Sequence, residues 1–397
     1  MNVAALKRML PSSLFLKLSA GYFWYFGIIG LFLPFISVYL NYLGFDSKSI
    51  GETLAIATAS KIFGPALWAK LADRTGQQLR IIQVSVLLSL LGFASLFVTH
   101  DYWHIVLCLV VFSLFNAAIL PQLEVLTQNS IRRKAKIYAR IRLWGSIGFV
   151  FMAILGGEVI HFFTANAFVG LGVIILFGLL LTSSFIRQPK RALNRKKQVY
   201  VSIGGHLTQR NVVLFFIVGV LLQISFGPYY NFYALYLQQL RYPSFAVGSL
   251  IGVSIVAEIS VFIYAGAIFK RISIQTAFIT SLMLTTIRWL IMAFGASTVS
   301  LMVIGQVFHA ASFALFHCAS LLFLQRYFEK TQQSRAQAIY VGGIYGIGGA
   351  VGAYWAGLTW NDGSGAQSSF ILAASIALVG ACLLFFMNKQ HIDLDNM

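Results

Sequence analysis

Charged side chains are scarce in this sequence of 397 residues. Asp, Glu, Lys and Arg together make up 10% of the chain, and only 11 residues are acidic. Soluble domains carry about 25% charged residues, and the mean hydropathy here is +0.80. A chain this apolar would expose too much nonpolar surface to water, so a lipid bilayer is its natural solvent.

Cysteine and nucleotide-binding motifs are also lacking. Cys108, Cys318 and Cys382 lie inside apolar runs, without the spacing of metal ligands or of a disulfide framework. No G-x-x-x-x-G-K-[ST] motif occurs, which argues against ATP as a driving force. The apolar run that follows Lys17 is too long for the core of a signal peptide, so we interpret it as a retained helix. We expect no metal, no other cofactor and no enzymatic activity.

Long apolar runs fill most of the chain. A membrane-spanning helix needs about 20 mostly apolar residues. The sequence predicts twelve such helices, near 18–41, 48–69, 79–98, 103–126, 138–160, 165–186, 211–238, 244–269, 274–294, 299–325, 335–359 and 367–388. One connection is long, polar and basic, so we interpret 188–209 as a cytoplasmic linker between an N-terminal six-helix half, 1–187, and a C-terminal half, 210–397.

The formal net charge of +18 indicates the orientation of the chain. If the N-terminus is inside, the cytoplasmic segments hold most basic residues, whereas the outer loops hold only Lys48 and Arg241. Such a bias places both termini in the cytoplasm of a multi-pass protein of the inner, or plasma, membrane. A nucleic-acid partner would need one basic face interleaved with aromatic residues, and the sequence shows none. We expect a monomer in the lipid bilayer.

The two halves align at a constant offset of 197 residues. Matching pairs are Tyr39 and Tyr236, Gly51 and Gly248, Arg74 and Arg271, Ala139 and Ala336, and Gly145 and Gly342. Two parallel six-helix repeats are typical of major facilitator transporters, whose substrate site lies between the halves near the bilayer midplane. The same offset pairs Lys61 with Glu258. A central charge facing lipid costs roughly 2.5–3.5 kcal/mol, so we expect both residues to face the cavity or the other half.

Residues 69–80, "AKLADRTGQQLR", follow the second predicted helix on the cytoplasmic side. They resemble the major facilitator loop signature G-x-L-A-D-R-x-G-[RK]-[RK], although Ala69 replaces the first Gly and two Gln residues replace the basic pair. We predict that Asp73, Arg74 and Gly76 form a gating motif. Gly76 suits a left-handed turn, and Asp73 is placed to interact with a helix N-terminus or a cation as a latch.

Ionisable residues inside predicted spans are functional hypotheses by default. The stretch from Asn116 to Gly148 resembles lactose permease and the oligosaccharide–proton symporters. In that family a helix 4 Glu and a helix 5 Arg, 18 residues apart, hold substrate, and Glu124 and Arg142 have this separation. The alternative is a fixed Glu124–Arg142 strut. Phe149 stands where the family has a sugar-stacking Trp, which argues against a sugar.

A fuller resemblance, to the phenylpropionate permease family, covers nearly the whole chain. It rests on segments such as "RIRLWGSIGFV", "LLQISFGPYYNFYALYL", "VAEISVF", "IRWLIM" and "HAASFALFHCAS". The resemblance places four residues on family positions: Glu258, Arg288, His309 and His317. We predict that Glu258, His309 and His317 couple protons. The predicted substrate-binding residues are Glu124, Arg142, Gln223, Tyr229, Asn231 and Arg288.

The helix 10 site resembles that of lactose permease in His309 but lacks its neighbouring carboxylate, because Ser312 stands there. Proton coupling would therefore use another acid, and Glu258 is our first choice. The sequence predicts a secondary active transporter whose partners are a small-molecule substrate and protons. The resemblance implies symport of an aromatic carboxylate such as 3-phenylpropionate by alternating access. A sugar or nucleoside proton symporter, or an exporter on the same fold, remains as an alternative.

Overall fold

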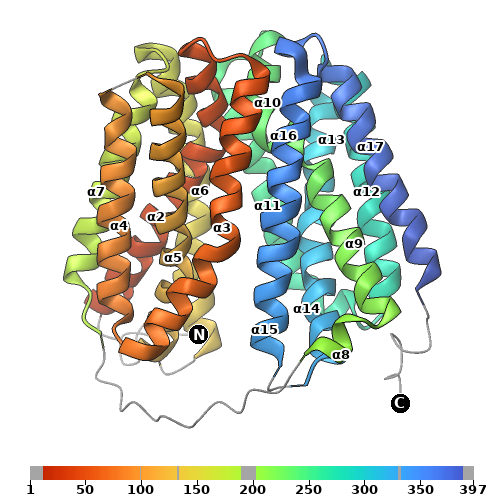
Figure 1. Ribbon diagram of the computed structural model, residues 1–397, viewed down its shortest axis with the longest axis horizontal. Helices are drawn as coiled ribbons and strands as arrows, with labels where there is room; N and C mark the ends of the chain where they lie inside the picture. The colour runs from red at the N-terminus through yellow and green to blue at the C-terminus, as the bar shows by residue number, and fades with distance from the viewer. Residues whose placement is uncertain (1–11, 99, 132–133, 189–202, 330–331, 388–397) are drawn as a thin grey trace. The chain divides into compact units, whose positions relative to one another are not determined.

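The structure, a computed structural model, describes residues 12–98, 100–131, 134–188, 203–329 and 332–387, and within these ranges it contains helices and no strand (Figure 1). Ten helical segments are long and apolar enough to cross a membrane by length and composition. The other two predicted spans are also helical. One, α3 (Ser47–Thr75), carries several charged residues. The other is divided into α15 (Gln333–Ile339), η3 (Tyr340–Ile347) and α16 (Gly348–Trp360).

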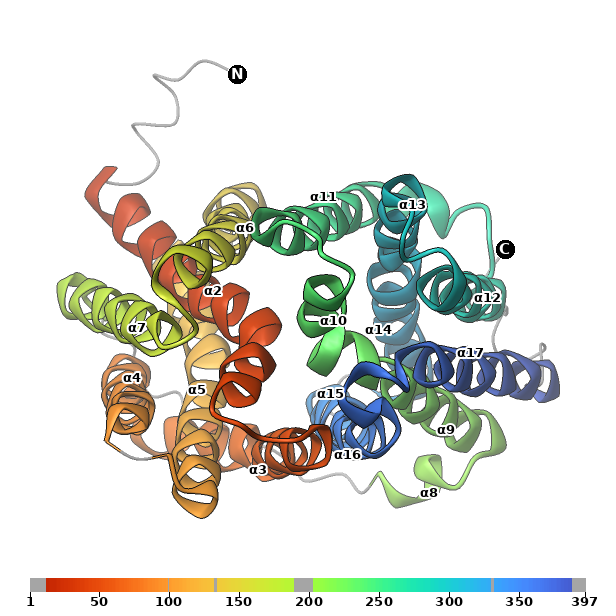
Figure 2. The ribbon, with the colours of Figure 1, turned by 90° about the horizontal axis from the view of Figure 1, so that it is seen from above.

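Two compact units make up the described chain, and the first comprises Met1–Leu43, Phe63–Arg195 and Ser244–Gly248. Its helices are α2 (Ser12–Tyr42), α4 (Gln78–Ala94), η1 (Ser95–Phe97), α5 (Tyr102–Ser130), α6 (Ala135–Phe163) and α7 (Ala167–Phe185). Within this unit α2 packs against both α6 and α7, and α4 packs against α5 and α7 (Figure 2).

Small residues let α2 and α6 approach at backbone distance. A Cβ atom at Gly148 of α6 would overlap the backbone carbonyl of Phe23 in α2. A Cβ at Gly30 of α2 would likewise overlap the backbone of Phe149 in α6. Membrane helices associate through such close packing because lipid provides no hydrophobic driving force between them. The contact brings the side chains of α2 directly against those of α6.

The second unit comprises Gly44–Ile62, Lys196–Pro243 and Ser249–Met397. Besides residues 47–62 of α3 and the segments α15, η3 and α16, it contains α11 (Ser244–Ile268) from Ser249 onward. Its other helices are α8 (Gly204–Leu207), α9 (Arg210–Ser225), α10 (Gly227–Gln239), α12 (Ile274–Phe294), α13 (Val299–His309), η2 (Ala310–Leu315), α14 (Phe316–Tyr327), η4 (Asn361–Gly363), α17 (Ala366–Leu383) and η5 (Leu384–Phe386). In this unit α12 packs against α13, η2, α14 and α17.

Two segments of the second unit, η2 and η3, are π-helical turns inside longer helices. π-Helical turns are rare and occur frequently at functional sites. Both lie next to titratable side chains: η2 follows His309 directly, and η3 begins at Tyr340.

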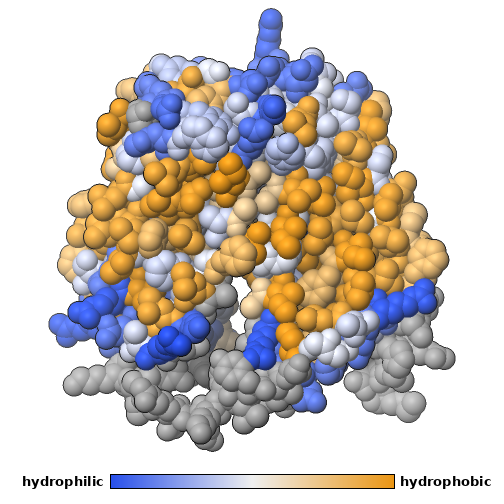
Figure 3. All heavy atoms as spheres, viewed as in Figure 1, coloured by the Kyte–Doolittle hydropathy of each residue, from blue (hydrophilic) through white to orange (hydrophobic). Residues whose placement is uncertain are grey.

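The surface follows the requirement of a bilayer. On the face shown in Figure 3, apolar side chains cover the middle of the helices and hydrophilic ones gather at the helix ends. The exposed apolar residues include Leu107, Phe151, Phe177, Ile263 and Val379, all of which lie inside predicted spans. Lipid-facing apolar side chains of this kind are expected for a membrane protein.

Candidate functional site

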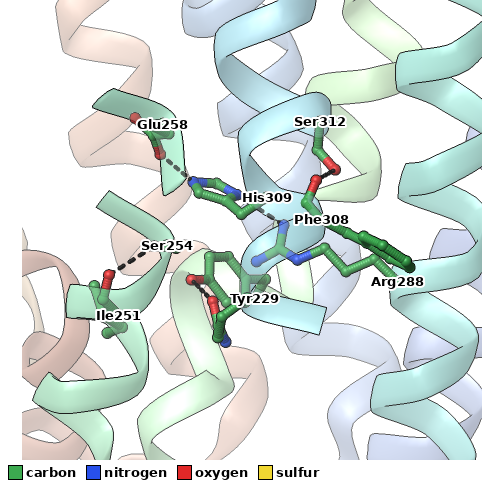
Figure 4. Close-up of polar contacts among 9 residues, drawn as sticks. Tyr229, Ile251, Ser254, Glu258, Arg288, Phe308, His309 and Ser312 are labelled. Atoms are coloured by element: carbon green, nitrogen blue, oxygen red, sulfur yellow. Dashed lines mark hydrogen bonds and ion pairs between the residues drawn. The ribbon is translucent and has the colours of Figure 1, made fainter. Parts of the chain in front are cut away.

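His309, the last residue of α13, connects an acid on α11 to a cation on α12 (Figure 4). Its Nε2 lies 2.8 Å from Oε1 of Glu258, and its Nδ1 lies 2.9 Å from Nη1 of Arg288. Arginine only donates hydrogen bonds, so Nδ1 of His309 is the acceptor. The proton of the neutral imidazole is therefore on Nε2, which donates to the Glu258 carboxylate. We call Glu258, His309 and Arg288 the charge network.

Arg288 is a fully buried cation whose hydrogen bonds are incomplete. Its exposed fraction is 0%, and among the described residues Nε and Nη2 have no hydrogen-bond partner. The guanidinium carbon lies 4.1 Å from the ring centre of Tyr229 and 4.4 Å from that of Trp289. Cation–π contacts stabilise a desolvated guanidinium by about 2 kcal/mol, but they leave the two N–H groups unpaired.

Neighbouring hydrogen bonds fix the rings around Arg288. Tyr229 donates its hydroxyl to Oε1 of Gln306 at 2.9 Å, and Nε2 of Gln306 donates to the Tyr233 hydroxyl at 2.7 Å. The indole N–H of Trp289 donates to Ser225 at 3.2 Å. Ser225 ends α9 and Pro228 lies in the first turn of α10. The break between these helices therefore places Tyr229 over the guanidinium.

Four residues that the sequence singled out lie outside the charge network: Lys61, Gln223, Asn231 and Ser312. Asn231 donates to the carbonyl of Gly227 in its own helix at 2.8 Å. Gln223 is buried at the end of α9, where its Cβ packs against Gly348. Lys61 is half-buried on α3, and among the described residues Glu258 pairs with His309 and not with Lys61. Ser312 is buried and donates to the carbonyl of Phe308 at 3.0 Å.

His317 belongs to a second polar cluster, which sequence reasoning found only in part. Its Nδ1 lies 3.0 Å from the hydroxyl of Tyr340 and 3.4 Å from that of Tyr345, and the two hydroxyls lie 3.0 Å apart. The Phe313 ring stacks on His309 on one side and on His317 on the other. Phe313 therefore lies between the two histidines along this helix. Tyr340 and Tyr345 were not among the predicted site residues.

In the first unit, Arg142 of α6 lies over the Phe26 ring of α2, with 3.9 Å between the guanidinium carbon and the ring centre. Glu124 of α5 accepts a hydrogen bond of 3.2 Å from the Tyr138 hydroxyl. No ion pair within 4.0 Å joins Glu124 and Arg142 in the part of the chain that the structure describes. Gly145 makes room for this arrangement, because a Cβ there would lie 2.9 Å from Nη1 of Arg142.

The predicted gating motif lies at the end of α3. Gly76 has a φ of 66°, the left-handed conformation expected for it. The Gln188 side chain holds this turn: its Nε2 donates to the Gly76 carbonyl at 2.6 Å, and its Oε1 accepts from the backbone N–H of Leu79 at 2.9 Å. Arg74 is exposed in the last turn of α3, and the side chain of Asp73 lies outside the described residues.

Comparisons with known proteins identify the family. The model of the MFS_1 like family matches residues 15–372. The chain belongs to this family. It is 31% identical over 332 residues to the "Probable 3-phenylpropionic acid transporter" of Escherichia coli (strain K12), a match that covers 81% of this chain and 85% of that protein. It is also 23% identical to the maltose permease of Geobacillus stearothermophilus, over 93% of both chains.

A solved structure supports the fold independently. A mutant of the nucleoside transporter NupG superposes with a TM-score of 0.85 at 19% identity, covering 95% of this chain and 100% of the other. With its family membership and its 31% identical relative, the protein is a multi-pass membrane transporter of the major facilitator type and not an enzyme. Among the described residues no cluster of metal-ligating side chains occurs.

Proposed function

We propose that this protein is a symporter that moves a small aromatic carboxylate together with a proton by alternating access. The observation that carries the proposal is the unpaired edge of Arg288. Nε and Nη2 lie on one edge of the planar guanidinium and point their N–H groups in parallel. This fork matches the two oxygens of a carboxylate, and both donors lack a partner among the described residues.

The rings beside this edge favour an aromatic substrate. Tyr229, Trp289 and Phe226 surround the guanidinium. Aromatic side chains bind an arene through offset-stacked or edge-to-face contacts. Since Arg288 is fully buried, a substrate reaches its free edge only after a neighbouring group moves. Alternating access provides such a movement, and the similarity to a 3-phenylpropionic acid transporter supports the same substrate class.

The charge network also supplies a route for proton coupling. Glu258 contacts His309, and His309 contacts Arg288, so one imidazole separates the acid from the cation. A proton taken up by the Glu258–His309 pair removes a negative charge near Arg288. Binding of an anion to Arg288 is then more favourable, and by reciprocity the bound anion favours the proton. Mutual stabilisation of this kind is what symport requires.

Uptake into proteoliposomes tests the proposal. Wild-type protein should accumulate radiolabelled 3-phenylpropionate above equilibrium when an inward proton gradient is imposed. Glu258→Gln should keep counterflow exchange and lose this uphill uptake, because the amide cannot carry the proton. Glu158→Gln, a carboxylate of α6 outside the network, is the matched control and should retain uphill uptake. Uphill uptake by Glu258→Gln would contradict the coupling role of Glu258.

A substrate panel tests the choice of substrate separately. The panel should include aromatic carboxylates, neutral aromatic alcohols, maltose and nucleosides, since permeases of the latter kinds are similar to this chain. The proposal predicts that the aromatic carboxylates compete with labelled 3-phenylpropionate and that the alcohols do not. If maltose competes and the aromatic carboxylates do not, the result favours a sugar symporter. If only a nucleoside competes, it favours a nucleoside symporter.

A further inference from the structure

The cluster of His317, Tyr340 and Tyr345, here called the histidine–tyrosine triad, lies outside the charge network. It joins α14 to η3 within the second unit. Its three polar atoms lie 3.0 to 3.4 Å from one another. Tyr340 is 1% exposed, whereas His317 and Tyr345 are half-buried. Two members of the triad are therefore partly exposed.

The hydrogen bonds within the triad determine which donor and which acceptor remain for a ligand. The shorter contacts are satisfied when Tyr340 donates to Nδ1 of His317 and Tyr345 donates to the Tyr340 oxygen. A neutral imidazole that accepts at Nδ1 carries its proton on Nε2. The triad then presents one acceptor, the Tyr345 oxygen, and one donor, Nε2–H of His317. A hydroxyl group is complementary to either, because it both donates and accepts.

The triad lies one aromatic ring away from the charge network. The Phe313 ring centre is 5.8 Å from that of His309 and 6.1 Å from that of His317, with interplanar angles of 15° and 4°. Phe313 is half-buried like its triad neighbours. Glu258 is close enough to interact electrostatically with both His317 and Tyr345. The two polar groups therefore lie along one side of the helix 299–327, with an aromatic ring between them.

We propose that the triad is a specificity subsite for a ring hydroxyl at the end of the substrate remote from its carboxylate. This inference rests on the proposed function, since Arg288 would hold the carboxylate. The arene would then extend from the rings beside Arg288 toward Phe313, and the hydroxyl would donate to Tyr345 or accept from His317. The preferred substrate class is thus a hydroxylated aromatic carboxylate with a short side chain.

Calorimetric binding to the purified protein tests the subsite. The ligands are 3-phenylpropionate and its analogues with a hydroxyl at the meta or para position of the ring. Wild-type protein should bind one hydroxylated analogue about 10-fold more tightly than 3-phenylpropionate, as expected for one well-placed hydrogen bond. Tyr345→Phe should reduce this preference to about 2-fold or less while affinity for 3-phenylpropionate stays unchanged.

Controls separate a subsite from a purely structural triad. Tyr354→Phe, an exposed tyrosine of α16, should leave the affinities for both acids unchanged. His317→Gln provides a second variant if Tyr345→Phe unfolds at a lower temperature than wild type. A variant that weakens both acids equally would show that the triad only joins two helices. That result would overturn the inference.

The same titrations distinguish this inference from the proposed function. If 3-phenylpropionate binds but neither hydroxyl adds affinity in wild-type protein, the subsite is wrong and the proposed function stands. If none of the carboxylates binds, the proposed function fails and the subsite fails with it. If Tyr345→Phe and His317→Gln both still prefer the hydroxylated analogue over 3-phenylpropionate, the hydroxyl binds outside the triad.

Discussion

Arg288 is a charged side chain with an exposed fraction of 0%, so its burial has a cost in free energy. An uncompensated buried charge costs several kcal/mol. Its direct contacts are His309, which accepts one hydrogen bond, and aromatic rings. Glu258, the carboxylate of the network, contacts His309 instead. A bound carboxylate would recover part of this cost, so we expect Arg288 to favour anions over neutral molecules of the same shape.

The first prediction concerns the shape of the cation at this position. Arg288→Lys keeps a positive charge but loses the planar fork and the donor to His309. Affinity for 3-phenylpropionate should fall at least about 10-fold, as expected for loss of a bidentate contact. Isothermal titration calorimetry of the purified variant measures this affinity. Arg271→Lys, an exposed arginine after α11, is the control, and equal affinities of Arg288→Lys and wild type would exclude bidentate binding.

The second prediction concerns the room that Gly145 provides. A Cβ at this position would lie 2.6 Å from a ring carbon of Phe26 and 2.9 Å from Nη1 of Arg142. Gly145→Ala should therefore destabilise the protein by about 1–3 kcal/mol through overpacking. The midpoint of thermal unfolding in detergent should decrease.

The control for this change is Gly266→Ala. A Cβ at Gly266 of α11 meets no atom within 4 Å, and alanine favours a helix by about 1 kcal/mol over glycine. The control should unfold at or above the wild-type midpoint. A Gly145→Ala variant as stable as this control would show that the Phe26 and Arg142 side chains rearrange without cost.

Sequence reasoning identified the members of the charge network but not their connections. Glu258, Arg288 and His309 stand out as ionisable residues in apolar runs. Their separation along the chain gives no information on which nitrogen of His309 faces which partner. Tyr340 and Tyr345 were overlooked because aromatic residues make up 15% of the chain, so two more tyrosines carry no signal. The predicted roles of Gln223, Asn231 and Lys61 stay predictions.

At the scale of elements, the N-terminus of α3 is capped by two carboxylates. Asp46 accepts a hydrogen bond of 2.8 Å from the backbone N–H of Ser49. The Ser49 hydroxyl and this N–H hold the pKa of Asp46 below its usual range. Asp362 in η4 accepts from the backbone N–H of Ser47 at 2.9 Å and from its hydroxyl at 2.7 Å. A positive φ of 51° at Asp362 aims its carboxylate at this helix end.

The third prediction is that Asp362 stabilises the first turn of α3. Asp362→Ala removes an acceptor of two hydrogen bonds, and loss of a helix cap costs about 1 kcal/mol. Hydrogen–deuterium exchange of the amides of residues 47–50 should be about fivefold faster. Ser368→Ala, a substitution at the start of α17, is the control. Unchanged exchange in Asp362→Ala would show that Asp46 alone suffices.

The helices themselves could be predicted because hydropathy and length decide them. Every described span lies within a few residues of its predicted position, and α11, α12 and the helix 299–327 begin at or next to the predicted residue. The π-helical turns η2 and η3 could not be predicted. They arise from one changed pattern of backbone hydrogen bonds, which leaves no periodic signal in the sequence.

At the scale of the whole molecule, the offset of 197 residues also relates the observed helices. When 197 is added to the residue numbers of α5, they become 299–327. The segments α13, η2 and α14 together span these same residues, Val299–Tyr327. Shifted α6 covers 332–360, and α15, η3 and α16 span Gln333–Trp360. One repeat unit therefore has uninterrupted helices where the other has π-turns. The charge network and the triad both draw on the interrupted repeat, in which η2 follows His309 and η3 contains Tyr340 and Tyr345.

The last prediction concerns orientation in the membrane, for which basic residues give the signal. Arg241 precedes α11 and Arg271 follows it, and both side chains are exposed. A helix of 25 residues is about 37 Å long at a rise of about 1.5 Å per residue, so the two positions lie on opposite sides of a bilayer. From the asymmetry of basic residues we predict that Arg241 lies outside and Arg271 lies in the cytoplasm. After replacement of the three native cysteines, Arg241→Cys should react with a membrane-impermeant maleimide in intact cells. Arg271→Cys should react only after the membrane is permeabilised, because its loop carries part of the basic charge that insertion retains inside. The reverse pattern of labelling would invert the topology and place both termini outside the cytoplasm.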